Sequence, residues 1–81
     1  MNIELNICRI CGYFEEDYFP WGEDGKTSSF DICICCNVEF GYEDINLDSI
    51  RKFRTSWISS DKFLSNSKYA NFLRNIPKEF L

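Results

Sequence analysis

The chain contains no histidine and no glutamine among its 81 residues. Without an imidazole there is no serine or cysteine triad of the usual kind and no ordinary histidine base. Long apolar runs are also missing, since none approaches the roughly 18 residues of a membrane-spanning helix. Residues 1–6 lack the basic segment and apolar stretch of a signal peptide. We therefore expect no signal peptide and no membrane partner.

Cysteines and aromatic residues, in contrast, are plentiful. Five residues are cysteine, 17% are aromatic and 44% are hydrophobic, a composition that argues against disorder. A chain this short has room for one small core, and such cores often need disulfides or a metal. A structural zinc can supply about 10–16 kcal/mol of apparent binding free energy. We therefore expect 1–81 to be a single domain that its cysteines stabilise.

The formal net charge of −4 is unevenly distributed along the chain. Residues 1–44 carry ten acidic residues against two basic ones, a balance of −8, and they contain all five cysteines. Residues 45–81 carry seven basic residues against three acidic ones, a balance of +4. No linker rich in proline, glycine or serine separates the two parts. The sequence therefore predicts one domain with an acidic, cysteine-rich half (1–44) and a basic half (45–81).

The acidic half has the pattern of short strands and turns. Hydrophobic residues alternate with polar ones in three places, which is typical of strands: Ile3, Leu5 and Ile7; Phe30 and Ile32; and Val38, Phe40 and Tyr42. The segment 20–25 is rich in turn-forming residues. Two hairpin-like arms are thus predicted to meet at the cysteines.

The basic half has the pattern of helices. Asn46 is a suitable N-cap with Asp48 in the first turn, and a hydrophobic stripe of Ile50, Phe53 and Trp57 follows. A break is expected near residues 59–61. A second helix is expected to start near Ser67, to present Tyr69, Phe72, Leu73 and Ile76 on one face, and to end before Pro77. The predicted class is therefore α+β, with one or two C-terminal helices.

The cysteines form two C-x-x-C pairs, Cys8 with Cys11 and Cys33 with Cys36, separated by 21 residues. Two such turns can present four thiolates in the tetrahedral arrangement of a zinc site. The position after each pair often needs a left-handed backbone, which Gly12 and Asn37 tolerate. We therefore predict that Cys8, Cys11, Cys33 and Cys36 bind zinc.

Other interpretations of the cysteines stay open. Two disulfides fit poorly with an odd cysteine count and no export signal, and a redox C-x-x-C is expected singly beside a βαβ pattern. Iron is the alternative metal, because four thiolates bind it as well as zinc. Cys35 could replace Cys33 or Cys36 as a ligand, could be a reactive thiol, or could simply fill space on the turn.

Two family resemblances follow from these motifs. The segment Cys11-Gly12-Tyr13 is similar to the metal-binding knuckle of rubredoxins, although the segment between the pairs is shorter here and Asn37 replaces the second glycine. The run Cys33-Ile34-Cys35-Cys36 resembles the C-P-C-C motif of uncharacterised bacterial cysteine-rich CPCC proteins, with Ile34 in place of proline. Segments 20–25, 38–44 and 75–81 are also similar to that group. The resemblance implies a bacterial, cytoplasmic metal-binding protein and assigns no reaction.

Three other sets of residues are candidates for functional sites. The acidic residues Glu15, Glu16, Asp17, Glu23 and Asp24 are expected on a solvated edge or on a surface that attracts a basic protein. The bases Arg51, Lys52, Arg54, Lys62, Lys68, Arg74 and Lys78, with Trp57, Tyr69 and Phe72, could bind nucleic acid; we do not expect this, because an acidic chain repels a polyanion. The aromatics Tyr18, Phe19 and Trp21 could anchor an interface, but we expect them to cover the metal site.

Together these patterns predict a zinc-ribbon or rubredoxin-like knuckle domain. Four thiolates leave no open position on the metal for water or substrate, so the zinc is expected to be structural and the protein not an enzyme. The expected function is recognition of a protein with a basic surface, as an adaptor or as an immunity or antitoxin-like inhibitor. An iron-containing electron carrier and a nucleic-acid-binding zinc module are the alternatives, and the sequence leaves the oligomeric state open.

Overall fold

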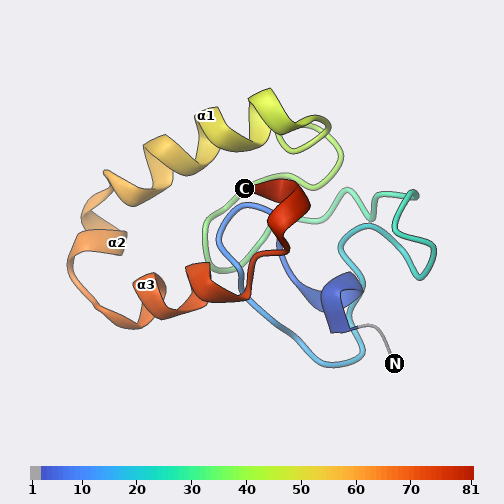
Figure 1. The fold of residues 1–81 in the computed structure, drawn as a ribbon, viewed down its shortest axis with the longest axis horizontal. Helices are drawn as coiled ribbons and strands as arrows, with labels where there is room; N and C mark the ends of the chain where they lie inside the picture. The colour runs from blue at the N-terminus through green and yellow to red at the C-terminus, as the bar shows by residue number, and fades with distance from the viewer. Residues whose placement is uncertain (1–2) are drawn as a thin grey trace.

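The computed structural model describes residues 3–81, and its regular elements are helical. A 3-10 helix, η1 (Ile3–Asn6), precedes a long stretch of loops and turns. Three α-helices follow, α1 (Leu47–Ile58), α2 (Asp61–Leu64) and α3 (Lys68–Phe72), and then two more 3-10 helices, η2 (Leu73–Asn75) and η3 (Lys78–Phe80). The three α-helices form an arc around the loops of the acidic half (Figure 1).

The strands predicted for the acidic half are wrong. Within residues 3–81, strand pairing is limited to two isolated antiparallel bridges, Ile7 with Phe14 and Ile32 with Glu39. The first predicted strand is instead η1. The other two alternations are interrupted by left-handed backbone at Phe30 (φ 59°) and Gly41 (φ 89°). Each arm therefore pairs at a single bridge and turns at once, so that the hairpin-like arms are present without strands.

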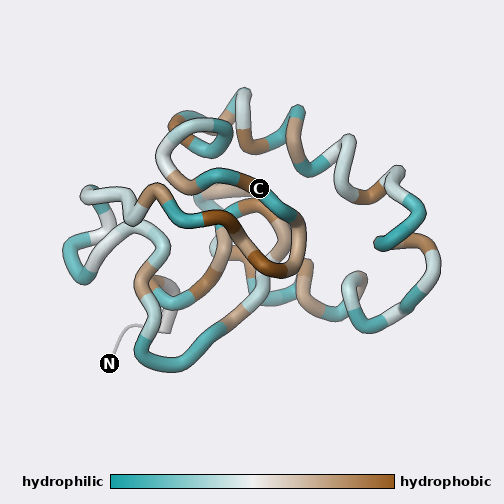
Figure 2. Tube along the Cα trace, turned by 180° about the vertical axis from the view of Figure 1, so that it is seen from behind, coloured by the Kyte–Doolittle hydropathy of each residue, from teal (hydrophilic) through white to brown (hydrophobic). Residues whose placement is uncertain are grey.

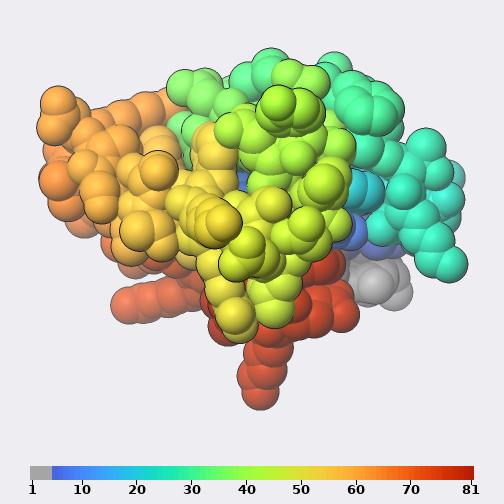
Figure 3. Space-filling view, turned by 90° about the horizontal axis from the view of Figure 1, so that it is seen from above, coloured from blue at the N-terminus to red at the C-terminus, as the bar shows by residue number. Residues whose placement is uncertain are grey.

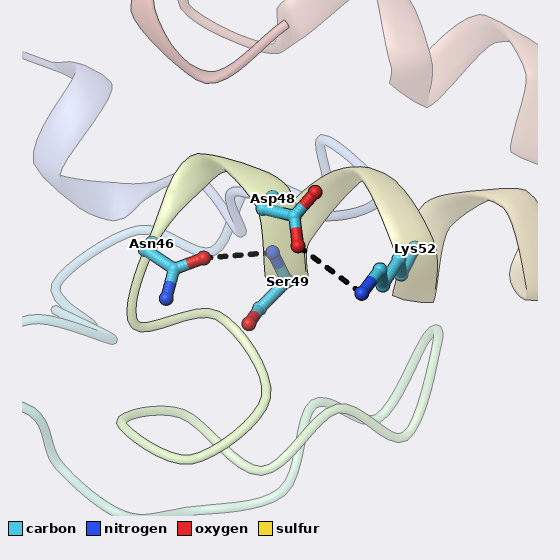
Figure 4. Close-up of polar contacts among 4 residues, drawn as sticks. All are labelled: Asn46, Asp48, Ser49 and Lys52. Carbon is cyan, nitrogen blue, oxygen red and sulfur yellow. Dashed lines mark hydrogen bonds and ion pairs between the residues drawn. The ribbon is translucent and has the colours of Figure 1, made fainter.

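The start of α1 was predicted correctly. The side chain of Asn46 accepts a hydrogen bond from the backbone N–H of Ser49 at 2.8 Å, and Asp48 lies in the first turn (Figure 4). This bond satisfies one of the N–H groups that have no partner inside the helix. Asp48 also forms an exposed ion pair with Lys52 at 3.2 Å. The helix therefore begins where local sequence signals place it.

The helices pack on the loops through aromatic rings. Ile50 and Trp57 of α1 are buried, as the predicted hydrophobic stripe requires. The Trp57 ring meets the rings of Phe63 at 5.6 Å and Tyr69 at 5.4 Å, both edge to face. Edge-to-face pairs at such distances are favoured by the ring quadrupole. The basic half therefore contains three α-helices, rather than the one or two expected, and aromatic contacts join them.

The core lies where the cysteine-containing loops meet α1. All five cysteines belong to the buried cluster, whose other members are Ile10, Val38, Phe40, Ile50 and Trp57. Figure 2 shows hydrophobic segments gathered in the middle of the molecule, with hydrophilic ones toward its edge. The cysteines therefore occupy the centre of the fold.

Among the helices of residues 3–81, none is long and apolar enough to cross a membrane.

Candidate metal centre

Each C-x-x-C pair lies in a tight turn, which we call a knuckle. In the first knuckle, residues 8–13, the Gly12 N–H donates to the Cys8 carbonyl at 3.0 Å and the Cys8 N–H donates to the Tyr13 carbonyl at 2.9 Å. Two backbone bonds in opposite directions thus close the turn. Both cysteine side chains are directed into the buried core cluster.

The second knuckle, residues 33–38, repeats this pattern. Its Asn37 N–H donates to the Cys33 carbonyl and its Cys33 N–H to the Val38 carbonyl, both at 2.9 Å. The left-handed backbone predicted after each pair is confirmed, with φ of 82° at Gly12 and 66° at Asn37. Glycine and asparagine adopt this conformation at the least cost. The two knuckles are therefore equivalent in backbone structure.

The knuckles bring together the four sulfurs that the sequence singled out. The Sγ atoms of Cys8, Cys11, Cys33 and Cys36 all lie within 4.8 Å of one another, and all four residues are buried. Across the knuckles, Cys8 Sγ is 3.8 Å from Cys36 Sγ, and Cys11 Sγ is 3.8 Å from Cys33 Sγ. A tetrahedral metal with bonds to sulfur of about 2.3 Å separates its ligands by about 3.8 Å. The four sulfurs thus have the spacing of a metal site, while zinc and iron fit the same donor set.

The thiols are free and interact with one another. No pair among the five cysteines forms a disulfide. Hydrogen bonding with the Cys11 thiol lowers the pKa of Cys33, and the same contact raises the pKa of Cys11. Cys35 is buried but is not one of the four clustered residues. The structure therefore separates four candidate ligands from one thiol beside them.

Two basic side chains of the helical half contact the knuckle backbones, which the sequence did not indicate. Arg54 of α1 donates to the carbonyl oxygens of Arg9 (2.6 Å) and Ile10 (2.9 Å), and also to Phe80. Lys62 of α2 donates to the carbonyl of Cys35 at 2.8 Å. Burial lowers the pKa of Arg54, and the charge of Cys8 opposes that shift. Each knuckle thus receives a cation from a helix.

The loop aromatics Trp21 and Tyr18 contact other residues of the fold, while a cover over the metal site stays a prediction. The Trp21 Nε1–H donates to the buried carboxylate of Asp44 at 2.7 Å. The guanidinium of Arg9 lies between the rings of Trp21 (4.2 Å) and Phe80 (4.3 Å). Tyr18 lies beside the core with its ring 6.4 Å from that of Phe40. A buried role for Asp44 could not be read from a sequence with so many acidic residues.

Most of the remaining charged residues lie on the surface. The acidic candidates are exposed, in agreement with a solvated edge: Glu15, Glu16, Asp17, Glu23 and Asp24. Of the basic candidates, Arg54 is half-buried and the others are exposed: Arg51, Lys52, Lys62, Lys68, Arg74 and Lys78. Trp57 is buried and Tyr69 and Phe72 are half-buried, so these rings belong to the helix packing.

The chain has relatives in Bacillus subtilis (strain 168). It is 31% identical to the uncharacterized protein YozI over 94% of this chain and 70% of YozI. It is 29% identical to the uncharacterized protein YoaQ over 89% of this chain and 68% of YoaQ. No family model matches, so the resemblance to CPCC proteins stays a prediction, and no solved structure matches either. The extent of the first match shows that the chain belongs to the same family as YozI.

Proposed function

We propose that the chain is a single-domain, non-enzymatic zinc protein whose metal is structural and whose function is to recognise another protein. The observation that carries the proposal is the cluster of four buried sulfurs at the spacing of a tetrahedral metal. Cys8, Cys11, Cys33 and Cys36 would hold the ion, and four thiolates leave no position for water or substrate. The two equivalent knuckles support a zinc-ribbon or rubredoxin-like arrangement.

A structural role for the metal is supported by its place in the fold. The candidate ligands lie in the middle of the core cluster, and helices α1 and α2 reach both knuckles through Arg54 and Lys62. In the described part of the acidic half, strand pairing is limited to two isolated bridges, so no extended sheet holds the loops together. A metal that links the knuckles would therefore organise the whole fold.

Recognition of a protein is supported by the charge distribution. The acidic half carries a balance of −8, and its carboxylates are largely exposed. Such a surface attracts a partner with a basic surface and speeds their association. A cytoplasmic adaptor, or an immunity or antitoxin-like inhibitor, has these properties.

Metal removal tests the structural part of the proposal. The purified protein is treated with a chelator under reducing conditions while metal content, helicity and melting temperature are followed. We expect one zinc per chain before treatment, no visible absorbance, and loss of helicity and of cooperative melting after the metal is removed. Unchanged helicity and melting temperature in metal-free protein would contradict a structural role, and a red protein with one iron per chain would identify iron instead.

A further inference from the structure

The acidic half contains a groove that no residue of the α-helices lines. Its volume is about 290 Å³, and all its lining residues lie between residues 6 and 40. We call its buried lining residues, which include Cys8, Cys33 and Phe40, the floor, and the half-buried Tyr13 and Tyr18 also line it. Ligand pockets usually begin at about 300 Å³, so this groove is the size for one or two side chains of a partner rather than for a large cofactor.

Exposed aliphatic side chains form one edge of the groove. Ile32 and Ile34 line it and are 53% and 68% exposed. Phe30, which directly precedes this lining segment, is also exposed and has the left-handed backbone that bulky residues rarely adopt. Large exposed apolar side chains next to a hollow are typical of protein interaction sites.

The charge around the groove is negative. Glu15 and Asp31 are among the lining residues, and no lysine or arginine is. Cys8 and Cys33 at the floor belong to the candidate ligand set, and four thiolates around a divalent metal carry a net charge of −2. Lys62 is near the edge, but its ammonium group donates hydrogen bonds to the carbonyl oxygens of Ile34 and Cys35 and does not line the groove. The groove therefore combines an apolar edge with a negative floor and rim.

We propose that this groove binds a cationic segment of a partner protein, in which an aliphatic or aromatic side chain packs on Ile32 and Ile34 while an adjacent lysine or arginine faces Glu15, Asp31 and the thiolate floor. This rests on the proposed function, since it names the surface and the partner chemistry for protein recognition. Charge complementarity selects the occupant. Asp31 already accepts a hydrogen bond from the Tyr18 hydroxyl at 2.8 Å, but an acidic or purely apolar segment would leave the negative charge of Glu15 and Asp31 without a positive charge opposite it.

The test is selection of short random peptides displayed on phage against the zinc-loaded protein. We expect the enriched peptides to contain lysine or arginine next to a large apolar residue. Binding of the synthetic peptides should fall about tenfold or more in an Ile32→Ser/Ile34→Ser variant, as for loss of an interface anchor. It should also weaken in a Glu15→Gln/Asp31→Asn variant, and the wild-type affinity should decrease with salt.

Matched controls use exposed residues elsewhere. Leu64 of α2 is 69% exposed, so Leu64→Ser removes an equally exposed aliphatic side chain away from the groove. Glu23→Gln removes an exposed charge that does not line it. All variants are first checked for unchanged zinc content and melting temperature. Neither control should alter peptide affinity.

Three results of the peptide experiment would overturn the proposal. They are no enrichment, enrichment of peptides without basic residues, and peptide binding that the groove variants leave unchanged. The last result would leave protein recognition standing at another surface, whereas the chelator experiment tests the proposed function independently of this groove. Self-association of the chain that is lost in the Ile32→Ser/Ile34→Ser variant would identify a second copy as the occupant and would also overturn the proposal.

Discussion

The two knuckles share one backbone structure but differ in their surroundings. Seen from above, the segment 41–46 and α1 cover the middle of the molecule, and little of the first knuckle is visible (Figure 3). Gly12 of the first knuckle is buried, whereas Asn37 at the same position of the second is exposed. The same local motif thus serves as an internal anchor in one place and as part of an open surface in the other.

The difference arises from the C-terminal segment, which packs on the first knuckle. The carbonyl of Gly12 accepts a bond from the Asn75 side chain at 3.1 Å, and a Cβ atom on Gly12 would collide with the Phe72 carbonyl oxygen. The second knuckle has Lys62 as its contact from the helices and leaves Ile34 exposed. Ile34, which follows the first cysteine of the second knuckle, is therefore free to contact a partner. Arg9, at the same position of the first knuckle, instead lies between the rings of Trp21 and Phe80.

The largest difference between the two knuckles is expected in the free energy of unfolding of variants at their left-handed positions, Gly12 and Asn37. Gly12→Ala combines a left-handed backbone with a collision against backbone atoms, so we expect a loss of about 3 kcal/mol or more in the free energy of unfolding. Asn37→Gly should change it by less than about 1 kcal/mol, because the exposed site has room and glycine accepts the conformation. Denaturant unfolding of the zinc-loaded proteins measures both. Equal effects would show that the surroundings of the knuckles do not differ in the way described.

A smaller difference in the free energy of unfolding is expected between variants of the two cations that contact the knuckles, Arg54 and Lys62. Arg54→Gln leaves the carbonyls of Arg9, Ile10 and Phe80 without their donor, so we expect a loss of about 2 kcal/mol. Lys62→Gln should cost less than about 1 kcal/mol, because Lys62 is exposed and water replaces it. Thermal and denaturant unfolding of the two variants, compared with the wild type, measure the difference. A larger loss for Lys62→Gln would reverse the assignment of the first knuckle as the anchor.

Local signals predicted the clustering of the four cysteines and the start of α1 better than they predicted the strands of the acidic half. The spacing of the cysteines indicated which four would meet, and Gly12 and Asn37 indicated the left-handed positions, because a knuckle is made by residues close in sequence. The cap at Asn46 is local for the same reason. These features need no knowledge of the rest of the fold.

The remaining features depend on contacts between distant residues. The alternation at Phe30 and Ile32 resembled a strand, but a strand needs a partner beyond the single bridge that this arm forms. Arg54 resembled the other exposed bases of α1 until the fold brought residues 9 and 10 next to it. Sequence alone could not show that one basic residue of the helix is half-buried against a knuckle.

The most direct test of the four-thiolate site is the zinc content per chain of three purified proteins: the wild type, Cys35→Ser and Cys36→Ser. The four clustered sulfurs include Cys36 and exclude its neighbour Cys35. We predict one zinc per chain in the wild type and in Cys35→Ser, and loss of bound zinc in Cys36→Ser. Zinc that is retained in Cys36→Ser and lost in Cys35→Ser would contradict the proposed ligand set.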